Sequence, residues 1–142
     1  MRIEEELFYN YLHSNNLRCS SERNAILKIF LDSEEHLTLE DILKSVVKKY
    51  PKLNLSTVYR NMKILTNIGL ATEWKGPDKK TYFEHKYKHS HHDHMICNNC
   101  GKIEEFKDDE IEKLQERAAR KRNFNISDHK LIVCGLCSKC KK

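Results

Sequence analysis

The sequence has few of the residues that build linkers, membrane spans and phosphate-binding loops. Its 142 residues include four glycines and two prolines, too few for a flexible linker or a collagen-like repeat. No segment approaches the roughly 20 consecutive apolar residues that cross a bilayer. The opening Met-Arg-Ile-Glu-Glu-Glu has no apolar signal-peptide core. We therefore expect a cytoplasmic protein with no membrane partner.

Signatures of catalysis are missing as well. The sequence has no H-E-x-x-H, no G-x-S-x-G and no glycine-rich phosphate loop, so we do not expect an enzyme. Its formal net charge of +5 and pI near 8.8 permit a nucleic-acid partner without requiring one. A metal-dependent hydrolase is a distant alternative, because the His/Asp cluster His91-His92-Asp93-His94 could form its metal site.

The first half has the periodicity of three amphipathic helices. Residues 3–15 place apolar side chains on one helical face. Ser20-Ser21 can cap a second helix that ends near residue 33. Thr38 and Asp41 resemble a capping box that opens a third helix, which Pro51 stops. These helices predict a small helical domain.

A fourth helix has two distinct faces. We expect it to begin after a Ser56 cap, to run over residues 57–68 and to end at Gly69, with a buried stripe of Val58, Met62 and Leu65. The opposite face carries groups that suit phosphates and base edges: Thr57, Tyr59, Arg60 and Lys63. An ordinary solvated face is the alternative interpretation.

The pattern then changes to strand-like alternation. Leu70, Thr72 and Trp74 alternate, Gly76-Pro77-Asp78 forms a turn, and Thr81-Tyr82-Phe83 is rich in strand formers. The predicted hairpin carries lysines near its tip, at positions 75, 79 and 80. Three helices, a helix with a polar outer face and a hairpin together predict a winged helix-turn-helix domain that binds double-stranded DNA.

The second half predicts a small α+β unit. Residues 1–84 form the first predicted domain, 85–90 a hinge and 91–142 the second domain. In the second we expect strands at 95–97 and 102–106, a helix from about residue 108 to 122, and a final strand from Asn125 to Val133. Its apolar residues are too few to form a stable hydrophobic core without help from a metal or a partner.

The cysteines predict a structural zinc site. Cys97-x-x-Cys100 and Cys137-x-x-Cys140 are two knuckles with zinc-ligand spacing. In a cytoplasmic protein, disulfides are disfavoured. Cys134 and Cys137 form a rival knuckle, so the second pair stays open at this point. Cys19 is expected to be a small buried apolar residue.

A histidine-rich run predicts a second kind of metal chemistry. Alternate residues of a strand share a face, so His92 and His94 should lie on one side and His91 and Asp93 on the other. Imidazole and carboxylate ligands suit Fe(II), Mn(II), Ni(II) or Zn(II). The alternative is a solvated polar loop with incidental histidines.

Three segments together carry a family resemblance: Leu55-Ser-Thr-Val-Tyr-Arg60, His91-His-Asp-His-Met-Ile-Cys-x-x-Cys100-Gly-Lys-Ile-x-Glu-Phe106 and Cys137-x-x-Cys140. The chain resembles the ferric uptake regulator family of metal-responsive repressors over almost its whole length. The resemblance implies a homodimer, which could pair into a tetramer, with a winged helix and a small α/β dimerisation domain. It also implies binding to A·T-rich inverted repeats.

The resemblance also implies roles for individual residues. Arg23, Tyr59 and Arg60 match DNA contacts, although Glu22 replaces a proline that often precedes Arg23. Structural Zn(II) would be held by Cys97, Cys100, Cys137 and Cys140. A regulatory metal would be held by His36, Glu84, His92, His94 and Glu105, with His85 or His89 as substitutes for Glu84. An additional metal site would comprise His91, Asp93, Glu112 and His129.

The resemblance favours Fe(II) as the regulatory metal. Peroxide-sensing relatives typically carry aspartate at the positions of Glu84 and Glu105, whereas iron sensors tend to carry glutamate. Zinc sensors usually add a cysteine near Glu84, and none is present. Iron sensing is therefore the prediction, with peroxide, zinc or manganese sensing as alternatives. Mn(II), Co(II) or Zn(II) can substitute at such ligands.

Overall fold

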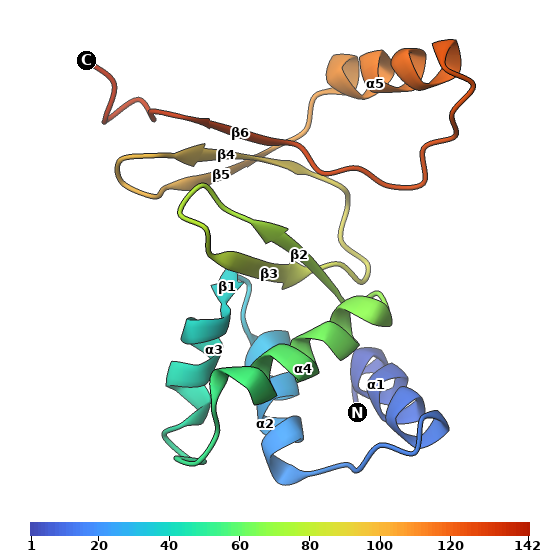
Figure 1. The fold of residues 1–142 in the computed structure, drawn as a ribbon, viewed down its shortest axis with the longest axis vertical. Coiled ribbons are helices and arrows are strands. Elements are labelled where there is room, and N and C mark those ends of the chain that lie inside the picture. Colours follow the sequence, from blue (N-terminus) through green and yellow to red (C-terminus); the bar gives the residue numbers. More distant parts are fainter. The chain divides into compact units, whose positions relative to one another are not determined.

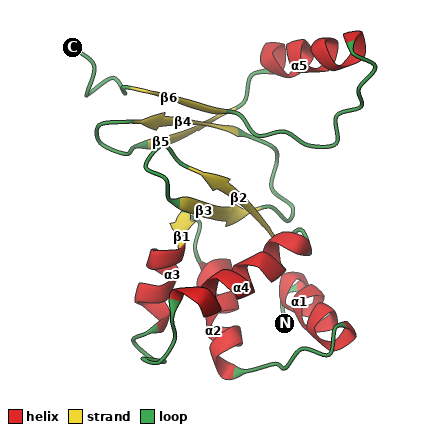
Figure 2. Ribbon diagram, in the orientation of Figure 1, coloured by secondary structure: helices red, strands yellow, loops and turns green.

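The computed structural model describes residues 1–142, which form five helices and six short strands (Figure 1). The chain divides into two compact units. The first comprises residues 1–75 and 79–89, and the second comprises residues 90–142 together with the turn at 76–78. Four helices belong to the first unit and one to the second (Figure 2). None of the helices combines the length and apolar composition that a membrane span requires.

The four predicted helices of the first half are confirmed. They are α1 (Ile3–Ser14), α2 (Ser21–Asp32), α3 (Leu39–Val46) and α4 (Leu55–Asn67). Ser20 caps α2 by accepting a hydrogen bond from the Arg23 amide at 3.2 Å. The Thr38–Asp41 capping box of α3 is present. These bonds satisfy backbone donors that have no partner inside the helix.

Two helix boundaries differ from the prediction. α3 ends at Val46, before Pro51, because the amides of Lys49 and Tyr50 both bond back to the Val46 carbonyl in a turn. α4 is capped by Asn54 instead of Ser56. The Asn54 side-chain oxygen accepts from the Thr57 amide at 3.0 Å, which is the reach of an N-cap residue to the third helical position.

A three-stranded sheet completes the first unit. The predicted hairpin is confirmed as β2 (Ala71–Lys75) and β3 (Thr81–His85), and it pairs Trp74 with Tyr82. Their rings stack with centroids 4.6 Å apart. The third strand, β1 (Leu37–Thr38), pairs antiparallel with β3 and was not predicted. Two residues are too few to produce a detectable alternation.

The main hydrophobic core lies in the first unit. Its fully buried members come from four helices and the sheet: Phe8, Leu12, Ile26, Leu27, Phe30, Ile42, Val46, Val58, Met62, Leu65, Leu70 and Phe83. The predicted stripe of α4 is part of this core. Burial of each large apolar side chain stabilises the fold by about 1.5–3 kcal/mol. The first unit therefore has the means to fold on its own contacts.

The second unit contains a sheet in the order β5-β4-β6 and the helix α5 (Asp109–Lys121). The central strand β4 (Asp93–Cys97) pairs antiparallel with β5 (Ile103–Phe106) and parallel with β6 (Ile132–Gly135). Its buried apolar residues are only Ile96 and Cys97, and α5 buries none. This unit has little hydrophobic core of its own.

The prediction of a final strand from Asn125 to Val133 is wrong. β6 begins at Ile132, where it pairs with His94, and ends at Gly135. Asn125, Ser127 and Asp128 disfavour strand conformation. The strand therefore starts only where the apolar residues meet β4.

Candidate metal centres and DNA-contact surface

The four-cysteine cluster forms where β4 and β6 end. Parallel pairing sets Cys97 of β4 opposite Gly135 of β6, so the turns that follow the two strands lie side by side. Cys100 lies in one turn, and Cys137 and Cys140 lie in the other. The four sulfur atoms all lie within 4.8 Å of one another.

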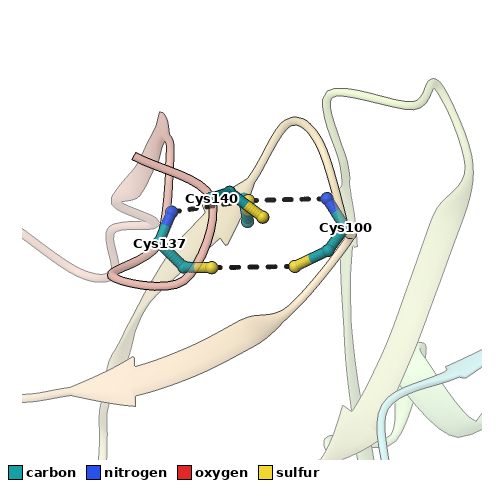
Figure 3. Close-up of side chains that lie close together, drawn as sticks. Cys100, Cys137 and Cys140 are labelled. Carbon is teal, nitrogen blue, oxygen red and sulfur yellow. Dashed lines mark hydrogen bonds between the residues drawn. The ribbon is translucent and has the colours of Figure 1, made fainter. Parts of the chain in front are cut away.

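The spacing of these sulfurs fits zinc. The sulfur atoms of Cys100 and Cys137 point toward each other, 3.7 Å apart, with Cys140 beside them (Figure 3). Two thiolates of a tetrahedral site with zinc–sulfur bonds of 2.3 Å would lie about 3.8 Å apart. Cys134 lies in β6, is exposed and is not part of the cluster. The geometry therefore supports Cys137-x-x-Cys140 as the second knuckle, as the resemblance implied.

Backbone amides favour the metal-binding form of Cys97. The amides of Cys100 and Cys137 donate to the Cys97 sulfur at 3.5 and 3.4 Å, and these bonds lower the pKa of the Cys97 thiol from 9.0 to about 6. For Cys140, the Asn99 amide lowers the thiol pKa, but the neighbouring Cys137 thiol and burial raise it to a net value of about 11. A thiolate, not a thiol, is the zinc ligand.

Cys19 does not behave as predicted. It is exposed, and its thiol donates to the Asn24 side-chain oxygen at 3.4 Å. The prediction of a small buried apolar residue is therefore wrong. Cys19 lies in the connection before α2, outside the apolar faces of both neighbouring helices, and this position explains its exposure.

A second cluster in the same unit joins one face of β4 to α5 and to the segment before β6. It contains His91, Asp93, Glu112 and His129, whose candidate ligand atoms lie within 4.8 Å of one another. Asp93 Oδ1 is 3.2 Å from His91 Nε2 and 3.6 Å from His129 Nε2. Glu112 Oε1 is 3.3 and 3.4 Å from the same two nitrogens.

Four atoms of this cluster, from three of its residues, are buried without hydrogen-bond partners. These atoms are both carboxylate oxygens of Asp93, Oε1 of Glu112 and Nε2 of His129. Buried polar groups in native proteins are normally hydrogen-bonded, so such a set needs another partner. Four ligands at about 2.1 Å around a tetrahedral ion would lie about 3.4 Å apart. The separations of 3.2–3.6 Å fit such an ion.

In the first unit, His36 and Glu84 form a close pair. Nε2 of His36 lies 2.7 Å from Oε2 of Glu84, and both side chains are mostly buried. The pairing of β1 with β3 explains this contact, because Leu37 faces Phe83 across the two strands. His85 instead contacts the Phe30 carbonyl, so Glu84, and not its neighbour, is the partner of His36.

In the second unit, His92, His94 and Glu105 gather on the other face of β4. His94 is opposite Glu105 across β4 and β5, and His92 Nε2 lies 3.5 Å from Glu105 Oε1. The rings of His92 and His94 are 4.9 Å apart. His92 Nδ1 contacts the Ser90 carbonyl at 3.3 Å, and a contact of this kind orients the histidine ring. The predicted division, with His92 and His94 on one face and His91 and Asp93 on the other, is confirmed.

The outer face of α4 is also formed as predicted. Tyr59 and Arg60 are exposed, and Arg60 donates to the Thr57 hydroxyl at 3.4 Å. Arg23 lies in the first turn of α2, and its Nε is buried without a hydrogen-bond partner. Lys63 forms an ion pair with Glu73 of β2. Sequence reasoning missed Glu73, since no local pattern links residues ten positions apart on a helix and a strand.

Comparison with known proteins places this chain in a family. The model of the family described as "Ferric uptake regulator family" matches residues 14–134. The chain belongs to the ferric uptake regulator (Fur) family. It is therefore a metal-dependent transcriptional regulator and not an enzyme, and the hydrolase alternative is abandoned. Fur-family regulators bind DNA operators as dimers.

Individual relatives divide between iron and peroxide regulators. The chain is 34% identical over 131 residues to the peroxide operon regulator of Bacillus subtilis, covering 92% of this chain and 89% of the relative. It is 32% identical over 133 residues to the ferric uptake regulation protein of the same organism, covering 91% and 89%. The two relatives are therefore about equally similar to this chain.

A solved structure supports the fold. The ferric uptake regulator of Helicobacter pylori, which has three functional metal-binding sites, superposes with a TM-score of 0.82 at 27% identity. The match covers 98% of this chain and 94% of that one. The α+β Fur architecture, with a helical DNA-binding domain followed by a domain with a four-cysteine cluster, is thus confirmed.

Proposed function

We propose that this Fur-family protein is an iron-dependent repressor. It acts in the cytoplasm as a homodimer on A·T-rich inverted repeats of double-stranded DNA. The observation that carries the proposal is the presence in one chain of an exposed polar face on α4 and of imidazole–carboxylate groups separate from the four-cysteine cluster. A structural ion held by four thiolates does not exchange readily, whereas nitrogen and oxygen ligands suit a metal that binds reversibly.

The DNA-contact surface in this proposal comprises Arg23, Thr57, Tyr59, Arg60 and Lys63. Tyr59 and Arg60 are the candidates for contacts with base edges, since they are exposed on α4. The lysines at 75, 79 and 80 are exposed and would supply salt-dependent phosphate contacts. A dimer would place two such surfaces on the two halves of an inverted repeat.

The proposed regulatory ligands come from both units: His36 and Glu84 of the first, and His92, His94 and Glu105 of the second. Each group by itself offers too few ligands to complete a coordination sphere. A Lewis-acidic divalent ion held jointly by both groups would favour one arrangement of the units over others. Differential binding of this kind is all that a co-repressor needs in order to shift a population.

The other two metal roles follow from donor chemistry. Cys97, Cys100, Cys137 and Cys140 would hold structural Zn(II). His91, Asp93, Glu112 and His129 would hold an additional ion. The three functional metal-binding sites of the Helicobacter pylori relative are consistent with this count.

Binding of DNA under controlled metal tests the proposal. Zinc-replete protein is titrated without oxygen onto an A·T-rich inverted-repeat duplex, with chelator and then with Fe(II), Mn(II) or Zn(II). We expect binding only with Fe(II) or Mn(II). The variant His94→Ala should lose metal-dependent binding, yet stay folded with its zinc. Tight binding in the presence of chelator, or full activity of His94→Ala, would contradict the proposed site.

Peroxide sensing is the second candidate, because the Bacillus subtilis peroxide operon regulator is as similar as the ferric relative. In that case, hydrogen peroxide would transfer one oxygen atom to a ligand histidine such as His36 of the Fe(II)-loaded protein, with water as the other product. Peptide mass spectrometry after peroxide treatment distinguishes the two. A gain of one oxygen together with loss of DNA binding would favour the peroxide sensor. An unmodified peptide would favour the iron sensor.

A further inference from the structure

Lys63 of α4 and Glu73 of β2 form a contact that the proposed function does not use. Their Nζ and Oε1 atoms are 2.6 Å apart, and the two side chains are about two-thirds buried, with 36% and 26% of their surface exposed. The hydrogen bond that Lys63 donates to Glu73 raises the pKa of the lysine. Lys63 therefore stays charged, but its charge is compensated by a neighbouring carboxylate.

The same lysine lies over the ring of Tyr59. Its Nζ is 5.8 Å from the ring centroid, within the range of a cation–π contact. Tyr59 is one helical turn before Lys63, so both side chains lie on the same face of α4. Glu73 thus holds the cation in a position where it restrains the exposed tyrosine that we assign to base reading.

Arg60 provides the contrast. It is exposed and donates to the neutral hydroxyl of Thr57. Its guanidinium can approach a phosphate or a base edge without first leaving a carboxylate. Lys63 would have to break its ion pair with Glu73, which is fixed on a strand opposite Phe83.

We propose that Glu73 is a specificity-determining residue of the DNA-binding surface, which keeps Lys63 on the Tyr59 ring and away from the phosphate backbone. A lysine on a phosphate adds affinity for every sequence equally. Withholding that lysine lowers non-specific affinity, while the restrained tyrosine keeps its contacts with bases. Within the proposed DNA-contact surface, Lys63 would thereby act by positioning Tyr59, and its own charge would stay on Glu73 instead of a phosphate. This inference rests on the proposed function, because it concerns how that surface discriminates between DNA sequences.

The dependence of binding on salt distinguishes these roles. Metal-loaded full-length protein is titrated with an A·T-rich inverted-repeat duplex and with a scrambled duplex of equal length and composition, each at several salt concentrations. Each phosphate contact contributes about 0.9 to the slope of log K against log salt. For Glu73→Gln we expect several-fold tighter binding to the scrambled duplex, a slope steeper by about one, and a smaller preference for the inverted repeat.

Variants of Lys63 complete the test. Lys63→Met should leave the slope unchanged and weaken binding to the inverted repeat more than to the scrambled duplex. The double variant, Glu73→Gln with Lys63→Met, should have the same slope as the unmodified protein. Glu6→Gln removes an exposed carboxylate elsewhere in the first unit and should leave the slope unchanged. Thermal unfolding of each variant checks the fold, and Lys63→Met remains decisive if Glu73→Gln fails to fold.

Two other outcomes have separate meanings. A slope that falls by about one in Lys63→Met, together with no effect of Glu73→Gln, would make Lys63 an ordinary phosphate contact and would overturn this inference. Absence of any metal-dependent preference in the unmodified protein would instead overturn the proposed function. In that case, the salt slopes of the unmodified protein and of Glu73→Gln on the scrambled duplex would still show whether Glu73 keeps Lys63 away from phosphates.

Discussion

Trp74, the single tryptophan of the chain, lies beside the His36–Glu84 pair of the first unit. Its ring meets the His36 ring edge-on, with centroids 5.8 Å apart, and stacks on Tyr82. It is 4% exposed. Its emission therefore depends on these fixed neighbours and little on solvent.

This geometry predicts an optical signal for the regulatory metal. A paramagnetic ion bound to His36 should quench Trp74 fluorescence strongly, while Zn(II), with its filled d shell, should quench it less. The measurement is an anaerobic fluorescence titration with Mn(II), Fe(II) and Zn(II). His36→Ala should abolish the difference between the ions. Equal quenching in His36→Ala and in the unmodified protein would mean that this histidine is not a ligand.

At the scale of elements, α4 depends on a cap that lies outside the segment predicted for it. Asn54 satisfies the Thr57 amide and so holds the first helical turn, which carries Thr57 and leads into Tyr59 and Arg60. The cap therefore fixes where α4 begins and, with it, the position of the face that we propose contacts DNA.

Asn54→Ala should lower the free energy of unfolding of the first unit by about 1 kcal/mol, because one amide at the helix start loses its partner. The matched control is Ser56→Ala, two residues further on, for which we expect a change within about 0.5 kcal/mol. Urea unfolding at fixed metal, followed by helical circular dichroism, measures both. A larger effect of Ser56→Ala would restore Ser56 as the cap.

The strand β4 contributes residues to three clusters of candidate metal ligands. Asp93, His94 and Cys97 each belong to a different cluster, because alternate side chains point to opposite faces and the strand ends at a cysteine knuckle. Asp93 and His94 are 1% and 5% exposed. Buried polar residues in the centre of a sheet carry a desolvation cost, which a bound metal offsets.

At the scale of the whole molecule, the two units have different sources of stability. The first has a core drawn from its helices and sheet, whereas the second has two buried apolar residues. Several large apolar side chains of the second unit stay exposed: Met95, Leu114, Phe124, Val133 and Leu136. Apolar surface of this extent is typical of a unit that needs a metal or a second subunit.

Loss of zinc should therefore unfold the second unit and spare the first. Cys137→Ser removes one thiolate of a site whose apparent binding free energy is of the order of 10–16 kcal/mol in small zinc domains. We expect loss of zinc and of hydrogen-exchange protection in β4 and β6, with protection of α2 and α4 retained. Exchange followed by mass spectrometry, together with metal analysis, measures this outcome.

Cys134→Ser is the matched control. It changes an exposed cysteine three residues earlier, and it should keep both zinc and protection. Release of zinc from Cys134→Ser would contradict the four-cysteine assignment, and loss of protection throughout both units would contradict their separate stability.

Much of this organisation was accessible from local patterns. The helices of the first half, the hairpin and the two-sided ligand distribution of β4 follow from periodicities of 3.6 and 2 residues, which short-range sterics impose. The cysteine spacing predicts zinc because the bite of a C-x-x-C knuckle is local. These features agree with the structure because each depends on residues within a few positions of one another.

Local patterns therefore identify the helices, the hairpin and the residue types of the candidate metal ligands, but neither β1 nor the start of β6. Contacts between distant residues come from the folded chain: β1 sets His36 against Glu84, β6 begins at Ile132 opposite His94, Cys134 lies outside the cluster, and Glu73 holds Lys63. The physical reason is that strand register and side-chain contacts between distant residues arise from packing and desolvation over the whole unit, which no local pattern encodes.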